Sequence, residues 1–284
     1  MNETGDKKLH IDIDEVLKSR VPKLHRFMPR FAVRCIERLV CQDKLNALLD
    51  FAGNLRDAEF CRAVLDYLKI TRHVTGEENM PKENESGRVI FVSNHPLGGL
   101  DGMALIDYLG RMSHTGKVKF VVNDLLMAIE PLKGVFLPVN KHGGQSRTAA
   151  DALDAAMRGD DPIVVFPAGL CSRRQKGGKI MDMEWNKMFV NKAITYGRDV
   201  IPIHFSGENS KFFYIFAKIR KRLFIPFNLE MVLLPREVFG NEGSAFEMTI
   251  GNRISCKSLK GGKESGETAR RIKESVYRLS RRCN

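Results

Sequence analysis

The 284-residue sequence contains no apolar run that approaches the roughly 18 residues needed to cross a bilayer. Its amino-terminal stretch, MNETGDKKLHIDIDEVLK, also has no apolar segment of the kind that secretory signals contain. These two absences predict a protein that is made and kept in the cytoplasm.

Several chemical motifs are also missing. No C-x-x-C pair occurs, so the sequence predicts no metal site and no redox pair, and its scattered cysteines are expected to be free thiols. No G-x-S-x-G is present, which argues against a serine-hydrolase elbow. No G-x-x-x-x-G-K-[ST] is present, which argues against phosphate transfer from ATP through a Walker loop.

What the chain does contain is a change of pattern near residue 88. Residues 10–70 have helical spacing, and we expect an N-terminal helical region over 1–75. From Arg88, β-rich segments alternate with helical candidates, which indicates an α/β fold with a largely parallel, mixed sheet flanked by helices. We assign this domain to 88–255 and a basic C-terminal helix to 256–284. The expected strands are RVIFVSN, KVKFVVN, GVFLPVN, DPIVVFPAG, DVIPIHFSG, LEMVLLP and FEMTIGN, and the expected helices are 101–112, 145–158 and 184–196.

The net charge of +12 favours a polyanionic partner. In VPKLHRFMPRF (21–31) and KFFYIFAKIRKRLFIPF (211–227), apolar side chains are flanked by cations, as at a lipid headgroup interface. We therefore predict contact with an anionic membrane surface, with the N-terminal region as one candidate. The alternative, a core-facing helix with a solvated basic face, stays open for both stretches. No nucleic-acid-binding motif is visible, so no nucleic-acid partner is expected.

The segment VIFVSNHPLGGLDGMALIDYLG (89–110) begins as a strand and ends as a helix. A turn through Gly98 and Gly99 can bring His95 and Asp101 together, although they are six residues apart. A carboxylate that accepts from one imidazole nitrogen leaves the other free to take a proton, which makes a general base. The simpler alternative, in which Asp101 caps the helix and His95 is an ordinary loop residue, stays open. By exclusion, such a base fits attack on an acyl group that is already reactive, such as a thioester.

Four blocks, in this order, resemble the glycerolipid acyltransferase family (the lysophosphatidate acyltransferase superfamily). They are NHPLGGLDG, NDLLMAIEPLKGVFLPVNK, VVFPAGLCSRR and VIPIHFSG, within residues 88–255. The first block has H-x5-D where the family has H-x4-D, and the third has Ala168 where the family usually has Glu. Both departures resemble the hemolysin-like branch, which includes bacterial O-acyltransferases of lyso-ornithine and lyso-glycine lipids.

The resemblance implies the glycerolipid acyltransferase fold and a set of roles. His95 would deprotonate the acceptor hydroxyl, and Asp101 would orient His95. Backbone N–H groups of the turn at Gly98 and Gly99, or of Gly169, would stabilise the tetrahedral oxyanion. Because arginine binds a carboxylate bidentately, we also predict that Arg173 or Arg174 holds the acceptor's anionic head, with Gly169 and Ser172 in the same loop. Lys141 is a weaker candidate for that site or for the acyl carrier, and a solvated basic loop is the alternative.

By the same resemblance, the acyl donor is an acyl carrier protein or coenzyme A thioester and the acceptor is a lyso-amino-acid lipid. No metal and no tightly held cofactor is implied. The enzyme would work as a peripheral protein on the cytoplasmic face of the bacterial inner membrane. Cys171 is not expected to act as a nucleophile, and His204 is expected to pack in the core.

Two other functions are weighed against this prediction. One is a 1-acylglycerol-3-phosphate acyltransferase of phospholipid synthesis, but the missing Glu at Ala168 argues against a phosphate-bearing acceptor. The other is a non-catalytic, basic membrane-binding protein with an inactive acyltransferase fold. The presence of both His95 and Asp101 argues against that alternative.

Overall fold

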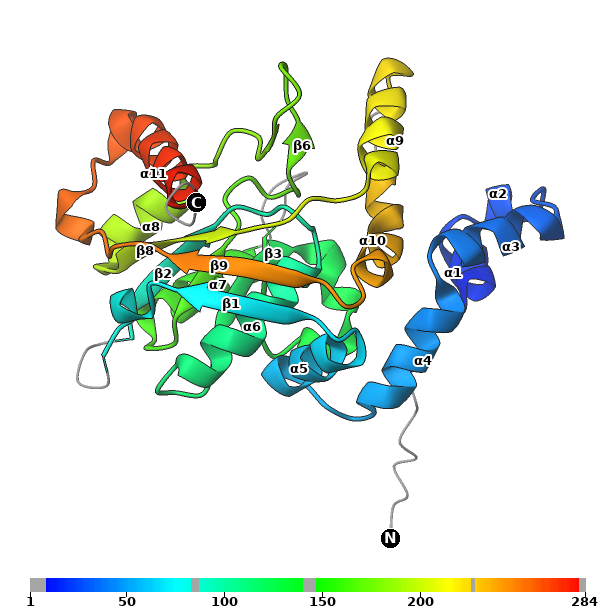
Figure 1. The fold of residues 1–284 in the computed structure, drawn as a ribbon, viewed down its shortest axis with the longest axis horizontal. Helices are drawn as coiled ribbons and strands as arrows, with labels where there is room; N and C mark the ends of the chain where they lie inside the picture. The colour runs from blue at the N-terminus through cyan, green and yellow to red at the C-terminus, as the bar shows by residue number, and fades with distance from the viewer. Residues whose placement is uncertain (1–8, 83–86, 140–146, 226–227, 281–284) are drawn as a thin grey trace, which may run out of the picture.

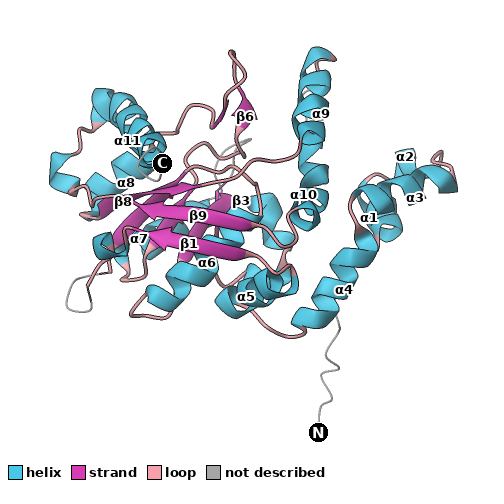
Figure 2. Ribbon diagram, viewed as in Figure 1, coloured by secondary structure: helices cyan, strands magenta, loops and turns pink. Residues whose placement is uncertain are grey.

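A computed structural model of the chain describes residues 9–82, 87–139, 147–225 and 228–280. A seven-stranded sheet in the order β1-β9-β8-β2-β5-β3-β4 forms the centre (Figures 1 and 2). Within this sheet, β8 and β9 pair in antiparallel fashion, and the other neighbouring strands pair in parallel. The strands are β1 (Thr71–Thr75), β2 (Val89–Ser93), β3 (Lys119–Asn123), β4 (Phe136–Val139), β5 (Ile163–Val165), β8 (Asp199–Phe205) and β9 (Ala245–Ile250). The predicted mixed, largely parallel sheet is confirmed.

Helices cover both faces of the sheet, and the burial of β2 is consistent with this arrangement. All five of its residues are buried, as expected for a parallel strand between two layers. Side chains alternate between the faces of a strand. Val89 and Phe91 therefore pack with α5 (Asp57–Tyr67) and α6 (Leu100–Met112), whereas Ile90 and Val92 pack with the helices of the other face. Those helices are α7 (Arg147–Arg158), α8 (Met188–Tyr196) and α11 (Ser265–Leu279).

The two ends of the chain join this core in different ways. β1 lies within the predicted N-terminal helical region, yet it pairs with β9, and α5 packs on α6. Residues 57–75 are thus built into the α/β layers. At the other end, α11 buries its apolar stripe (Ala269, Ile272, Val276 and Leu279) against the sheet, as its spacing predicts.

The first four helices form an arm that extends from the body on the right of Figure 1. They are α1 (Ile13–Arg20), α2 (Pro22–His25), α3 (Arg30–Leu39) and α4 (Gln42–Ala52). Leu39 packs against a small apolar cluster around Cys171 and Phe213, which ties the arm to the body. Phe27 and Phe31 are 83% and 70% exposed, so this stretch does not bury its aromatic side chains.

A second projection rises from the edge of the sheet where β8 ends. It consists of α9 (Lys211–Arg222), the 3₁₀ helix η4 (Leu229–Leu233) and α10 (Leu234–Gly240). The segment LEMVLLP, predicted as a strand, is therefore helical, and that prediction is wrong. Pro235 occupies the first turn of α10, where its missing N–H and fixed φ suit a helix start. None of the helices in the described ranges is both long and apolar enough to span a membrane.

Candidate functional site

The site lies where three adjacent parallel strands end. In the order β8-β2-β5, the carboxyl ends carry His95 after β2, Phe166 after β5 and Ser206 after β8. Loops at the carboxyl edge of such a sheet are where ligands bind in α/β proteins. Asn94 connects the end of β2 to the end of β8. Its side-chain N–H donates to the backbone carbonyl of Phe205 (2.8 Å), and its side-chain oxygen accepts from the backbone N–H of Phe205 (2.7 Å).

His95 and Asp101 are in direct contact. His95 Nδ1 lies 2.9 Å from Asp101 Oδ2, and the Asp101 side chain is fully buried. An ionised carboxylate can only accept, so this contact places a proton on Nδ1. In the described part of the chain, no group hydrogen-bonds Nε2, and the His95 side chain is 14% exposed. The geometry therefore fits a base whose Nε2 faces a substrate; the catalytic role itself stays a prediction.

The carboxylate of Asp101 is held rigidly. Oδ2 also accepts from the N–H of Leu97 (3.0 Å), and Oδ1 accepts from the N–H of Gly102 (2.9 Å). Asp101 lies in the first turn of α6, where the helix dipole favours a negative charge. The helix begins after Gly99, which is its N-cap residue. Asp101 therefore does more than cap α6, because one of its oxygens orients the imidazole.

The turn between the two residues requires a glycine. Gly98 has φ +73°, and a Cβ there would lie 2.7 Å from Cδ2 of Leu234. In the described part of the chain, the N–H groups of Gly98 and Gly99 donate no hydrogen bond, and both residues are partly exposed. They fit as oxyanion donors. The N–H of Gly169 is already engaged with the carbonyl of Phe166 (2.9 Å), which makes it a weaker candidate.

The imidazole ring also has an aromatic support. The rings of His95 and Phe166 stack with centroids 3.9 Å apart and planes 18° apart. Phe166 begins the FPAG turn that follows β5. Together, the stacking and the bond to Asp101 fix both the plane of the imidazole and its rotation.

Asp182, whose carboxylate binds the backbone of His95, was not identified from the sequence. Its buried Oδ1 accepts from the His95 backbone N–H (3.2 Å) and from the Ser172 hydroxyl (2.6 Å). Its Oδ2 accepts from Trp185 Nε1 (2.8 Å). Its own N–H donates to the Tyr277 hydroxyl (2.7 Å), which connects it to α11. The only sequence signal is an acid among apolar residues in KIMDMEW.

The predicted substrate-binding residue Ser172 occupies a supporting position. Its side chain is buried, its N–H donates to the carbonyl of His95 (2.7 Å) and its hydroxyl donates to Asp182. These two bonds fasten the loop after the FPAG turn to the residue that carries the imidazole. Ser172 is placed to fix the site and not to face a substrate.

Arg173 is committed to internal partners. Its Nη2 donates to Oε1 of Glu230 (2.9 Å), and its Nη1 donates to the carbonyl of Cys171 (2.7 Å). Glu230 is fully buried and also lies 2.7 Å from Nε of Arg220. Two guanidinium groups thus share one carboxylate, which leaves an excess positive charge beside the loop after the FPAG turn.

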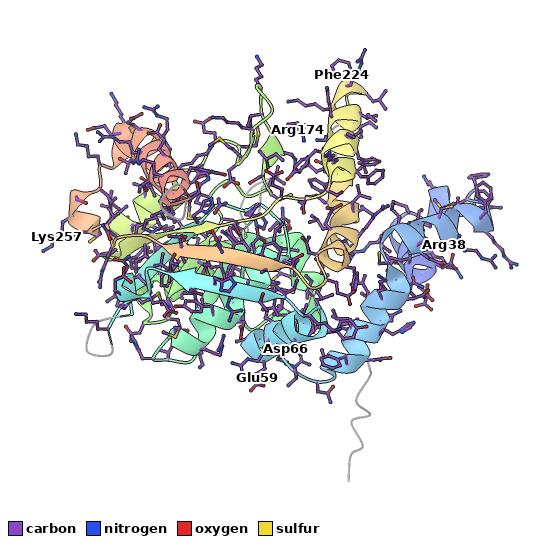
Figure 3. All side chains as sticks on the ribbon, in the orientation of Figure 1. Arg38, Glu59, Asp66, Arg174, Phe224 and Lys257 are labelled. Atoms are coloured by element: carbon purple, nitrogen blue, oxygen red, sulfur yellow. The ribbon has the colours of Figure 1, made fainter. Side chains whose placement is uncertain are left out.

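Arg174 points the other way. β6 (Arg173–Arg174) and β7 (Ile180–Met181) form a small antiparallel hairpin, so adjacent side chains face opposite sides. Arg174 is exposed beside α9, with its guanidinium carbon 5.9 Å from the centre of the Tyr214 ring (Figure 3). Of the two arginines, Arg174 is the one whose guanidinium is accessible to an anionic ligand. Lys141, the other predicted cation, lies outside the described residues.

Burial shifts the pKa values of two further side chains, Cys171 and His204. Burial raises the pKa of the Cys171 thiol to about 11, against the opposing effect of the Arg173 guanidinium, so the thiol is a poor nucleophile at neutral pH. His204, expected in the core, is half-buried with its ring centre 6.0 Å from that of Tyr277, and burial lowers its pKa to about 4. Among the described residues, no group of three or more His, Cys, Asp or Glu side chains is arranged to hold a metal ion.

A cavity of about 530 Å³ lies near this site, between the start of α4, α10 and the loop before α9. Its lining includes Lys44, Arg236 and Phe239, and neither His95 nor Asp101. α10 also contacts the glycine turn, because a Cβ at Gly99 would lie 3.3 Å from Val238. The dyad, which we predict to carry the chemistry, therefore lies outside this cavity.

The chain is similar to proteins of known activity. A family model described as "Acyltransferase" matches residues 15–282. Lyso-glycine lipid O-acyltransferase of Bacteroides thetaiotaomicron is 41% identical over 276 residues, covering 97% of this chain and 100% of that protein. The protein of the same name from Phocaeicola vulgatus is 42% identical over 276 residues, covering 97% of this chain and 97% of that protein. The crystal structure of the 1-acyl-sn-glycerophosphate acyltransferase PlsC of Thermotoga maritima aligns with a TM-score of 0.45 and 18% identity, over 92% of this chain and 83% of that one. The chain belongs to the acyltransferase family.

Proposed function

We propose that this acyltransferase moves a fatty acyl group from a thioester to the hydroxyl of a lyso-amino-acid lipid, with lyso-glycine lipid as the first candidate. Two relatives that carry the name lyso-glycine lipid O-acyltransferase support this acceptor, since the similarity extends over 97% of the chain. The observation that carries the chemistry is the 2.9 Å contact between His95 Nδ1 and buried Asp101, which leaves Nε2 available.

That geometry supports the following reaction. Nε2 of His95 takes the proton from the acceptor hydroxyl as its oxygen attacks the thioester carbonyl. The tetrahedral oxyanion accepts hydrogen bonds from the N–H groups of Gly98 and Gly99. The carbon–sulfur bond then breaks, the ester forms, and the imidazolium returns its proton to the departing thiolate. Asp101 stabilises the imidazolium during these steps.

The acceptor's carboxylate is assigned to Arg174. A guanidinium can bind a carboxylate through two parallel hydrogen bonds, and Arg174 is exposed beside the hairpin that follows the FPAG turn. Gly169 belongs to that turn and shapes the backbone there with a φ of +62°. Lys141 remains a second candidate for the same carboxylate or for the acyl donor.

The donor is proposed to be an acyl carrier protein or coenzyme A thioester, with no further cofactor. Both donors are acidic, and the net charge of +12 favours their approach. The acceptor is a membrane lipid, so the protein is proposed to act as a peripheral protein on the cytoplasmic face of the inner membrane. An anionic lipid surface attracts the same positive charge.

The test supplies purified protein with acyl carrier protein and coenzyme A thioesters, and with lyso-glycine lipid, lyso-ornithine lipid or 1-acylglycerol 3-phosphate. We expect acylation of an amino-acid lipid, loss of it in His95→Ala, and a raised KM for that acceptor in Arg174→Ala. Preferential acylation of the phosphate acceptor would overturn the headgroup assignment. A His95→Ala protein that keeps most of its activity would overturn the general base. No acylation at all by a protein that binds vesicles would favour the non-catalytic alternative.

A further inference from the structure

Helix α9 exposes a continuous apolar stripe. Phe212, Ile215, Ile219 and Leu223 are 43%, 55%, 53% and 63% exposed, and Phe224 at the tip is 92% exposed. Spacing of three and four residues places the first four on one side of the helix. Figure 3 shows Phe224 at the end of the helix farthest from the sheet. Such a clustered apolar surface marks an interaction site more often than scattered exposed side chains do.

The stripe faces outward because the other side of α9 is fixed. Phe213, Tyr214 and Ala217 are buried, and the Ser210 hydroxyl caps the helix by accepting from the N–H of Phe213 (3.2 Å). Arg220 lies 2.7 Å from the buried carboxylate of Glu230, which fastens the last turn. The helix therefore has no freedom to rotate its apolar stripe into the core.

Cations accompany the stripe. With about 100° per residue, Lys211, Lys218 and Arg222 lie along one flank of it. All three are exposed, and none of them forms an ion pair within the described ranges. An apolar strip with a basic flank matches the boundary between acyl chains and anionic headgroups.

The helix is also connected to the catalytic turn. The Asn209 side chain, just before α9, donates to the carbonyl of Pro96 (3.3 Å), next to His95. On the other side, Arg174 of the hairpin lies over Tyr214 of α9. A surface that holds the outer side of α9 thus lies beside both the proposed headgroup cation and the loop that carries the imidazole.

We propose that the stripe of α9 is a docking surface for an anionic lipid bilayer, and that it sets the site against the membrane from which the acceptor comes. The choice of a bilayer rests on the proposed function, because the acceptor is a lipid. An acidic carrier protein would be recognised through the basic flank alone. The apolar stripe is explained by insertion between lipid chains.

The experiment measures flotation of the full chain with vesicles of phosphatidylethanolamine and phosphatidylglycerol, and with vesicles of phosphatidylcholine alone. We expect binding to the anionic vesicles and a fall of about tenfold or more in the partition coefficient of the Ile215→Ser/Ile219→Ser double variant. Lys218→Gln/Arg222→Gln should lose roughly tenfold at low salt and less at high salt. The matched control is Met112→Ser/Ile194→Ser, which removes two exposed apolar side chains from α6 and α8 and should bind as the wild type does.

The outcomes separate this proposal from the proposed function. His95→Ala should float like the wild type although it is inactive. Stripe-dependent flotation by a wild-type protein with no acyltransfer activity would refute the function and leave the docking surface standing. Flotation of Ile215→Ser/Ile219→Ser equal to the wild type, with circular dichroism showing both folded, would refute the docking surface. So would binding of an acyl carrier protein that depends on the cations while no vesicle is bound.

Discussion

The backbone N–H of His95 donates a hydrogen bond to Oδ1 of Asp182, which lies 87 residues further along the chain. The same oxygen accepts the hydroxyl of Ser172, whose own N–H is bonded to the carbonyl of His95. Asp182, Ser172 and the backbone of His95 thus form a closed arrangement behind the imidazole. A change in the position of Asp182 should therefore also move His95, the proposed general base.

Replacing Asp182 with Asn is expected to lower kcat by up to about 10²-fold while KM for both substrates changes little. The amide can keep one acceptor oxygen but presents an N–H₂ group where Oδ2 now accepts from Trp185. The resulting shift moves the His95 backbone, and a displacement of about 1 Å at a reacting group can cost about that factor. Steady-state kinetics with each substrate varied in turn gives the separation.

Trp185→Phe is the control for this variant. It removes the donor to Oδ2 and leaves both contacts of Oδ1 in place. We therefore expect the melting temperature to fall, while kcat changes much less than in Asp182→Asn. Equal losses of kcat in the two variants would show that the two contacts of Oδ1 do not by themselves position His95.

Asp101→Asn tests the other support of the imidazole. The amide cannot stabilise the imidazolium by charge, and it can present an N–H to Nδ1, which selects the wrong tautomer. We expect kcat to fall by about 10²–10⁴-fold, with a small change in KM, because general-base catalysis contributes about that factor. Stopped-point assays with long incubation can measure the residual rate, and a rate near that of the wild type would exclude Asp101 from the mechanism.

The contact between His95 and Asp101 could be predicted because it is local. The five residues between them hold the two glycines that let the chain turn back, and the helix start that favours a carboxylate. The alternation of strands and helices after Arg88 likewise predicts most of the sheet. Both features depend on residues that are close together in the sequence, so a local pattern can predict them.

The remainder of the site depends on which strands lie side by side. Asn94 bonds to Phe205, 111 residues away, and His95 stacks on Phe166 only because β5 and β8 flank β2. Neither strand order nor register can be read from the local pattern of one sequence. The same applies to Arg173 and Arg174, whose different roles follow from the sides of a two-residue strand and from the buried Glu230.

We expect His204 to make the stability of the protein depend on pH in the acid range. Burial lowers its pKa to about 4, whereas the unfolded histidine titrates near its ordinary value of about 6.5. Between these values the unfolded chain binds a proton that the folded protein does not, so stability is full above about pH 6.5 and falls as the pH approaches 4. Urea unfolding at a series of pH values should show this loss, up to about 3 kcal/mol, and His204→Gln should remove that part of it.

Gly98→Ala tests whether the turn itself is required. At a φ of +73° an L-residue is strained, and the added Cβ would lie 2.7 Å from Leu234 and 3.2 Å from Cβ of Cys171. We expect the free energy of unfolding to fall by about 2–4 kcal/mol and kcat to fall with it, because the turn that carries the proposed oxyanion donors must move.

The control is Gly177→Ala in the β6–β7 hairpin, where φ is +87° and no atom lies within 4 Å of the new Cβ. That variant carries the backbone strain without the collision, so it should lose only about 1 kcal/mol and keep its activity. If Gly98→Ala kept both stability and kcat, the proposed role of this turn in catalysis would be wrong.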